Sequence, residues 1–433
     1  MHAYYVILAL TLLIIFSYLF DIISYKLRIP SVLLLIGTGI GLHYLLEFWG
    51  IPVPDLHLWV SILGLIGLLL IVLEAALDLK LSRDKLPVIL KAFATALIIL
   101  LVTSFAIAGM IYYLGLTHNF YIAFLNAIPL SVVSSAIVIP SVMNLDEDKK
   151  EFLIYESTFS DILGILLFDI VLAIPEAGKN VVTHVGVGML ITVLISLVTG
   201  YVLIFLFEQI STKVKFFLFL SILTALFIVG KILHLSSLIL ILIFGLMLEN
   251  YHVFFRGFLR RWYKKEKIEE VKEQFKLITF ETAFLVRTVF FVVFGLTIDI
   301  SAMGHPVILI IGSLILLLTF LVRYINLKLF YQSESIFPEV FMAPRGLITV
   351  LLFFKIPEYY QIPGFKEVIS FVILGSAFLM MLGLLISGKK TTKEEFEFVE
   401  KYDHGAFSQD DFPIDRWHLG HYQQTDNQEN TEP

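Results

Sequence analysis

Acidic side chains interrupt one of the long apolar stretches of this chain, and they are the residues whose types best suit chemistry. The stretch contains Glu156, Asp161 and Asp169, with Ser157 and Ser160 between them. On a helix, Ser157 and Asp161 are four residues apart and share one face, so a hydroxyl and a carboxylate have a common target. Oxygen ligands of this kind suit a hard cation, and a carboxylate can hold a proton instead. The spacing predicts a cation or proton site with Asp161 and Ser157 as its ligands.

The depth of Asp161 in this stretch, residues 151–174, supports a functional role. At 1.5 Å per residue of helix, Asp161 lies ~15 Å in from Glu151, close to the middle of a ~30 Å hydrocarbon layer. An ionisable side chain at that depth costs several kcal/mol unless it faces a cavity or a partner. We therefore interpret Asp161 as a site residue. For Asp169, an ion pair with a basic residue of another helix explains the charge equally well.

The elements that must position these residues are membrane-spanning helices. The chain has 433 residues, of which 58% are hydrophobic and 16% charged, whereas a soluble domain has ~45–50% and ~25%. It contains no cysteine, which excludes disulfides, thiolate metal sites and cysteine nucleophiles. We expect an all-α polytopic membrane protein with about thirteen spans of roughly 20 residues each. The predicted spans are 3–20, 32–48, 57–78, 88–115, 118–143, 151–174, 181–207, 214–233, 235–250, 274–298, 305–327, 335–354 and 366–387.

Charged residues in the connections predict the orientation. Lysine and arginine concentrate after the odd-numbered spans, and such connections are typically cytoplasmic. An odd number of spans then places the N-terminus outside and the C-terminus in the cytoplasm.

The segment 388–433 is acidic and poor in aliphatic residues, so we expect a disordered cytoplasmic tail after a transmembrane domain at 1–387. The basic connection 251–273 is expected to rest on anionic lipid. The apolar body has no basic face for nucleic acid.

Three arginines within the predicted spans are candidate partners for the acids. They are Arg287, Arg323 and Arg345. Depth favours Arg323 as the partner of Glu156, because both lie roughly one to two turns from the cytoplasmic side. We interpret that pair as a structural support of the site.

Two of the predicted spans, 118–143 and 335–354, contain residues that interrupt helices. These residues are Pro129, Ser134, Ser135 and Pro140 in the first span and Pro338, Pro344 and Gly346 in the second. The two spans hold matching positions in two groups of about six spans that run in opposite directions, an arrangement typical of a transporter's binding site. We expect the broken helices to cross at the midplane, where Arg345 would neutralise the negative half-helix ends.

Short segments of these spans resemble the monovalent cation:proton antiporter superfamily, the sodium/proton exchangers. Residues 156–161 (ESTFSD) resemble the family's E-S-x-x-N-D motif, residues 344–346 (PRG) its L-R-G segment, and residues 290–296 its F-F-x-x-x-G-L stretch. The resemblance extends over about 5–387. It implies that Asp161 binds the cation and the proton, in competition. It also implies that Glu156, Ser157 and Ser160 complete or support the site, with Arg323 paired to Glu156.

Two positions depart from the family pattern. Ser160 stands where the motif has asparagine, and Ser134-Ser135-Ala136 replaces the family's threonine–aspartate–proline, as in the potassium-efflux branch. Electrogenic members carry two adjacent aspartates, whereas this chain has Asp161 alone. The resemblance therefore implies electroneutral exchange of one proton for one cation, with Na⁺ expected and K⁺ or Li⁺ left open.

The resemblance also implies how the protein works as a whole. Family members are homodimers of the plasma membrane, serve pH homeostasis, and need neither ATP hydrolysis nor a cofactor. A core formed by residues 88–174 and 305–387 is expected to move against a dimerisation scaffold formed by residues 1–80 and 181–300.

Other functions remain as alternatives. One is proton-coupled transport of a different solute, and another is a K⁺ efflux pathway or channel, although no TVGYG-like filter is present. An intramembrane enzyme would need a nucleophile and a base, but the histidines near the spans all lie at their ends.

Overall fold

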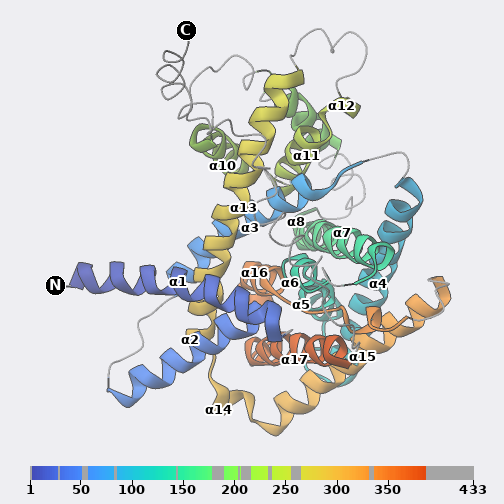
Figure 1. Cartoon of the computed structure of the whole chain (residues 1–433). Helices are drawn as coiled ribbons and strands as arrows, with labels where there is room; N and C mark the ends of the chain where they lie inside the picture. The colour runs from blue at the N-terminus through green and yellow to red at the C-terminus, as the bar shows by residue number, and fades with distance from the viewer. Residues whose placement is uncertain are drawn as a thin grey trace, which may run out of the picture. The chain divides into compact units, whose positions relative to one another are not determined.

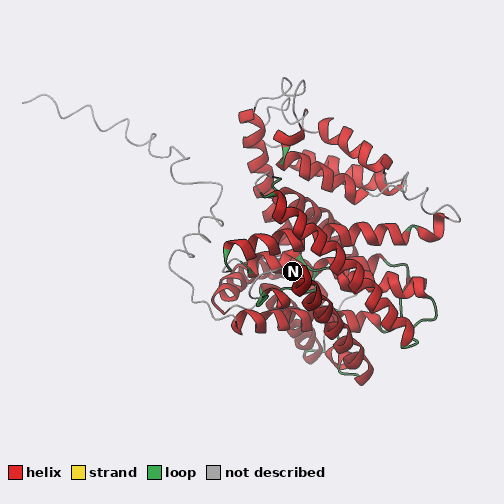
Figure 2. Ribbon diagram, turned by 90° about the vertical axis from the view of Figure 1, so that its right-hand side faces the viewer, coloured by secondary structure: helices red, strands yellow, loops and turns green. Residues whose placement is uncertain are grey.

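The computed structural model describes most of the first 386 residues. The described residues are 2–27, 30–50, 57–81, 85–142, 145–177, 190–202, 205, 216–232, 237–254, 265–330 and 336–386. Over these ranges the chain is helical and contains no β-strand, in agreement with the all-α prediction (Figures 1 and 2). The predicted span 181–207 is described only in part, and the tail 388–433 lies outside the described residues.

The helices follow the predicted spans in order. They are α1 (His2–Leu27), α2 (Ser31–Phe48), α3 (His57–Asp78), α4 (Leu86–Tyr113), α5 (Phe120–Ser131), α6 (Ser135–Ser141), α7 (Glu147–Leu172), α8 (Ile174–Ala177), α10 (Phe216–Ile232), α11 (Ser237–Glu249), α12 (Tyr251–Phe254), α13 (Lys265–Leu296), α14 (Ile300–Met303), α15 (Pro306–Phe330), η3 (Glu339–Phe341), α16 (Leu347–Lys355), η4 (Glu358–Tyr360) and α17 (Phe365–Ile386).

Six helical segments in the described part are each long and apolar enough to cross a membrane. They are Ser31–Phe48, Leu86–Tyr113, Phe120–Ser141, Lys272–Leu296, Pro306–Leu329 and Phe365–Ile386. The predicted basic connection 251–273 is not one continuous loop. Its end is already helical, because α13 begins at Lys265 and continues into the next span, while residues 255–264 lie outside the described residues.

Both interrupted spans are broken: the first away from its prolines, the second in the stretch that contains Pro344. Pro129 lies inside α5 and Pro140 inside α6, whereas the chain is extended at residues 132–134. The reason is that neighbouring side chains and backbone pair with the extended residues, as described below, whereas a proline near a helix end leaves the rest of the helix intact. In the second span, η3 is followed by a non-helical stretch at 342–346 before α16 begins.

The two extended stretches touch each other, as the crossing of broken helices requires. The backbone N–H of Ser134 donates to the carbonyl of Pro344, with an N···O distance of 3.0 Å. Gly346 lies against the same serine, and a Cβ atom there would approach Ser134 Oγ to 2.5 Å. Glycine at 346 therefore allows the close approach that brings the two breaks together.

Packing separates the helices into two groups. The core group consists of α4–α7, α15, η3, α16 and α17, which contact one another; the scaffold group consists of α1–α3, α10, α11 and α13. In the view of Figure 1, the core group lies to one side of the long helix α13. The groups meet where α16 and α7 contact α3, where α7 contacts α11 and where α17 contacts α2. The division into a core and a scaffold stays a prediction.

Glycines set the tightest contact within the scaffold group, between α2 and α13. A Cβ atom on Gly39 would lie 2.8 Å from Gly295 Cα and 2.9 Å from Leu296 N. Both are backbone atoms of a long helix, which cannot move aside as a flexible side chain can. One turn further on, His43 Nδ1 lies 2.8 Å from the carbonyl oxygen of Leu296.

We predict that Gly39→Ala destabilises the protein by about 1–3 kcal/mol, because the methyl group forces two helix backbones apart. Gly37→Ala is the matched control on the same helix, since a Cβ atom there meets nothing within 4 Å. The control should be neutral or slightly stabilising, because alanine favours helix over glycine. Thermal unfolding of the detergent-solubilised variants measures both. A Gly39→Ala protein that unfolds no earlier than the Gly37→Ala protein would contradict this packing.

Candidate functional site

Asp161 lies on α7 with only 2% of its surface exposed, directly opposite the first break. Its Oδ2 atom accepts two hydrogen bonds from Ser135, from the backbone N at 3.0 Å and from Oγ at 2.5 Å. Ser135 is the first residue of α6, so its N–H has no partner within its own helix. The other carboxylate oxygen, Oδ1, is buried and has no hydrogen-bond partner among the described residues. Such an oxygen is unusual in a folded protein and fits a place where a proton or cation binds.

Ser160, next to Asp161, holds the same break from a second point. Its Oγ accepts a hydrogen bond of 2.9 Å from the backbone N of Val133, in the extended stretch. Backbone groups that leave a helix inside a membrane must find partners in the protein. Ser160 therefore supports the break, and the chain unwinds here because α7 offers these two acceptors.

Ser157 does not supply the hydroxyl next to Asp161. Its Oγ donates to the carbonyl of Ile154 on its own helix, at 3.2 Å, while Ser135 makes the contact with Asp161. A shared helix face aligns the Cβ atoms, but a serine rotamer can turn the hydroxyl back to a carbonyl of the preceding turn. The oxygen of such a hydroxyl still has lone pairs, so Ser157 as a ligand of the cation stays a prediction.

Glu156 and Arg323 form the pair expected from their depth. Arg323 donates from Nη1 to Oε1 at 2.6 Å and from Nη2 to Oε2 at 2.8 Å, and both side chains are buried. Arg323 Nε also donates to the backbone carbonyl of Glu339 at 2.9 Å. One guanidinium therefore ties α15 to α7 and to η3. Two parallel hydrogen bonds fix the geometry as well as the charge.

Arg345 lies where the two first half-helices end. Its Nε donates to the carbonyl of Leu130 at 2.5 Å and its Nη1 to the carbonyl of Ala343 at 3.0 Å. Leu130 is in the last turn of α5, and Ala343 follows η3. Carbonyl ends of helices carry partial negative charge, so a cation is favourable here. The fully buried Arg345 thus lies as the sequence predicts, beside Pro344 and Gly346 in the second break.

Arg287 does not pair with an acid of α7. It donates from Nη2 to Glu74 of α3, at 3.0 Å from Oε1 and 3.2 Å from Oε2. Glu74 was missed in the sequence, although a carboxylate within the apolar span 57–78 is itself a signal. Both Glu74 and Arg287 interact electrostatically with Asp161. Glu74 therefore joins the candidate site from the scaffold side.

Asp169 has a basic partner on another helix, as expected if its role is structural. It forms an ion pair with Lys355 at the end of α16, and the two side chains are 17% and 22% exposed. The ammonium group also lies 5.6 Å from the centre of the Phe168 ring. The pair joins two helices of the core group.

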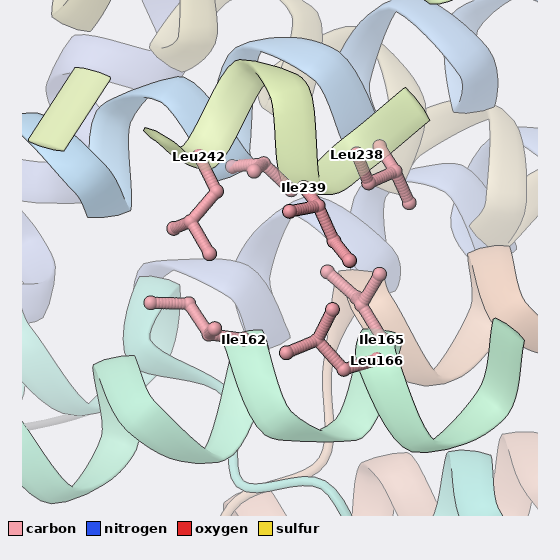
Figure 3. Close-up of a pocket in the computed structure, with 7 residues that line it drawn as sticks. Ile162, Ile165, Leu166, Leu238, Ile239 and Leu242 are labelled. Carbon is pink, nitrogen blue, oxygen red and sulfur yellow. The ribbon is translucent and has the colours of Figure 1, made fainter. Parts of the chain in front are cut away.

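Beside Asp161, the two helix groups meet across an aliphatic surface. A small cavity of ≈ 10 Å³ lies between α3, α7 and α11. It is lined by Val72, Ile162, Ile165, Leu166, Leu238, Ile239 and Leu242. Figure 3 shows the side chains of α7 and α11 facing each other across it. A cavity with an aliphatic lining offers a water molecule no hydrogen-bond partners. The lining of this cavity is apolar, whereas just after the end of α3 the hydroxyl of Tyr155 donates to the carbonyl of Lys80 at 3.2 Å.

No cluster of three or more histidine, aspartate or glutamate residues in the described ranges is arranged to hold a metal ion. The oxygen groups around Asp161 belong instead to one carboxylate, serine hydroxyls and unwound backbone. Groups of this kind suit a hard monovalent cation that stays only briefly.

Two interrupted helices that meet at a buried carboxylate define a secondary transporter of the broken-helix type. The chain belongs to the sodium/hydrogen exchanger family, whose transmembrane family model ("Sodium/hydrogen exchanger, transmembrane") matches residues 10–388.

Solved structures with the same fold include the sodium proton antiporter MjNhaP1 from Methanocaldococcus jannaschii at pH 8. It is 22% identical, with a TM-score of 0.65 over 88% of this chain and 100% of that chain. An electron-microscopy structure of MjNhaP1 gives 20% identity and a TM-score of 0.61, over 90% of this chain and 100% of that chain. No curated protein matches the chain.

We predict that Arg323→Ala costs about 3–5 kcal/mol of stability, because it leaves the buried Glu156 carboxylate without its cation. Lys355→Ala is the matched comparison, since it breaks a pair that water can partly reach, and it should cost about 1 kcal/mol or less. Thermal and denaturant unfolding in detergent measure both. Equal costs would show that burial does not distinguish the two pairs.

Proposed function

We propose that this protein is a secondary active antiporter that exchanges one Na⁺ for one H⁺, with both ions binding at Asp161. Membership of the sodium/hydrogen exchanger family supports cation:proton antiport as the reaction class. The observation that carries the site is the unpaired Oδ1 atom of Asp161, a buried acceptor beside two breaks in the helices. K⁺ and Li⁺ are the alternative cations, and Ser134-Ser135 in place of an acidic residue keeps K⁺ in consideration.

The proposed mechanism is competition for one carboxylate oxygen. The two donors of Ser135 occupy Oδ2, which leaves Oδ1 as the oxygen open to a guest. Burial favours the protonated carboxyl, whereas hydrogen bonds to the carboxylate and a bound cation favour the charged form. Oδ1 then holds either a proton or a cation. Because each guest carries one positive charge, the loaded site has the same net charge in both directions, which makes the exchange electroneutral.

Glu74 and Arg287 complete the proposed site from the scaffold group. Their ion pair keeps the charge next to Asp161 balanced while the site changes its guest. A desolvated cation needs several oxygen ligands, and the oxygens nearest to the breaks are candidates to supply them. Glu156 and Arg323 stay paired and hold the surrounding helices in place.

Exchange is obligatory if the core group moves only when Asp161 is occupied. We propose that α4–α7 and α15–α17, with η3, slide against the scaffold group along the aliphatic contact of α7 with α3 and α11. The fold resembles that of MjNhaP1, which is described as a sodium proton antiporter, and this likeness supports the reaction class. A homodimer in the plasma membrane, with the N-terminus outside and the tail in the cytoplasm, completes the proposal. Neither ATP nor a resident cofactor takes part.

We predict that Asp161→Asn abolishes cation-dependent proton movement. Everted vesicles containing a pH-sensitive dye are given a proton gradient, and Na⁺, K⁺ or Li⁺ is then added. The wild type should restore dye fluorescence, whereas Asp161→Asn should not. Asp169→Asn is the matched control, because it removes a carboxylate of the same helix that is paired with Lys355, and it should keep exchange.

Flux that persists in Asp161→Asn would reject the proposed site. Cation flow driven by the membrane potential without proton movement would favour the channel, and proton movement that depends on another solute would favour a different cargo.

We predict that the cation concentration for half-maximal exchange rises about tenfold for each unit of pH decrease in the acidic range, because protons and cations compete for one group. In the alkaline range this concentration should reach a plateau, since few protons compete there. Initial rates in proteoliposomes at a series of pH values, separately for Na⁺ and K⁺, measure the dependence. A half-maximal concentration that stays constant while only the maximal rate changes would contradict competition at Asp161.

A further inference from the structure

The first half of the second interrupted span is a single turn, η3, of only three residues. A turn of this length makes few hydrogen bonds of its own and does not hold a fixed position without help. Its position nevertheless matters, because the chain continues from it into the stretch that carries Pro344, Arg345 and Gly346. The residues that anchor η3 therefore control where that stretch lies.

Lys149 of α7 is one of these anchors. Its Nζ lies 2.6 Å from Glu339 Oε1 and donates to the carbonyl of Phe337 at 3.2 Å. Glu339 is completely buried, and neither of its carboxylate oxygens has a hydrogen-bond partner among the described residues, so the ion pair with Lys149 is what balances its charge. Lys149 is 18% exposed. A carboxylate buried to this degree depends on its cation far more than a surface carboxylate does.

The same face of α7 carries the other contacts that hold the breaks. Lys149, Glu156 and Ser160 are spaced at i, i+7 and i+11, which places them on one side of a helix. Glu156 reaches η3 through Arg323, which also holds the backbone carbonyl of Glu339. Ser160 holds the first break. The anchor of η3 and the acid Asp161 are therefore parts of one rigid helix.

We propose that Lys149 is a positioning residue for the cation site: paired with Glu339, it fixes η3 and through it the stretch 342–346. Lys149 is also one of the basic residues in the connections after odd-numbered spans that predict the orientation of the chain, and we assign it this second role. Its effect on transport rests on the proposed function, whereas its effect on the position of η3 does not.

Four variants separate positioning from stability. Lys149→Ala leaves a buried carboxylate unpaired, so it should lower the melting temperature and raise the half-maximal Na⁺ concentration about tenfold or more. Glu339→Gln should stay close to the wild type, because the amide oxygen can still face the ammonium group of Lys149, which also keeps its hydrogen bond to Phe337. The double variant Lys149→Ala/Glu339→Gln should recover the melting temperature but not the Na⁺ dependence. Lys149→Arg should recover both.

The matched control is Lys150→Ala. Lys150 follows directly on α7 and pairs with Glu147, whose side chain is 77% exposed. This variant should keep the Na⁺ dependence of the wild type. If the double variant recovers the Na⁺ dependence together with its melting temperature, Lys149 has only a stabilising role and the proposal is wrong.

A second measurement needs no transport. Because the chain has no cysteine, a spin label on Ile336→Cys, three residues before the start of η3, reports the mobility of this segment in the purified full-length protein. Lys149→Ala should increase the mobility of the label, and Lys150→Ala should not. Unchanged mobility would overturn the proposal even if the wild type exchanges Na⁺. If the wild type exchanges no Na⁺, the proposed function is rejected, but the mobility measurement still tests whether Lys149 positions η3.

Discussion

The constraint on which the structure depends is that two helices unwind where water is scarce. Their extended residues leave backbone N–H and carbonyl groups that must find partners inside the protein. Asp161 and Ser160 accept from the first break, and the two breaks pair with each other through Ser134 and Pro344. Arg345 donates to the carbonyls that remain. Unwinding is thus stable only because α7 and Arg345 are present.

This arrangement links the architecture to the proposed chemistry. Asp161 contributes one oxygen to the backbone of α6 and keeps the other free of protein donors. The hydrogen bonds from Ser135 fix the position of the carboxylate, and Oδ1, which has no donor among the described residues, is available for the proposed ion. A carboxylate fully satisfied by protein donors would be an equally good structural element but a poor binding site.

The ion pairs described above follow the division into two helix groups. Glu156–Arg323, Asp169–Lys355 and Glu339–Lys149 each join helices of the core group, whereas Glu74–Arg287 joins two helices of the scaffold group. None of these four pairs would have to break in the proposed sliding of one group past the other. Near Asp161 the contact between the groups is aliphatic, and its strength does not depend on the alignment of individual atoms.

Local composition and depth along each helix were enough to predict the order of the apolar helices, the two interrupted spans, a buried acid in the sixth span and the pairing of Glu156 with Arg323. Three features required the packed structure. They are the hydrogen bond of Ser135 to Asp161, the position of the first break at residues 132–134, and the pairing of Arg287 with Glu74. The physical reason is that hydropathy and helical period fix the depth and face of a residue along its own helix. Which neighbouring helix stands opposite that face, and which rotamer it selects, follows from packing between segments far apart in the chain.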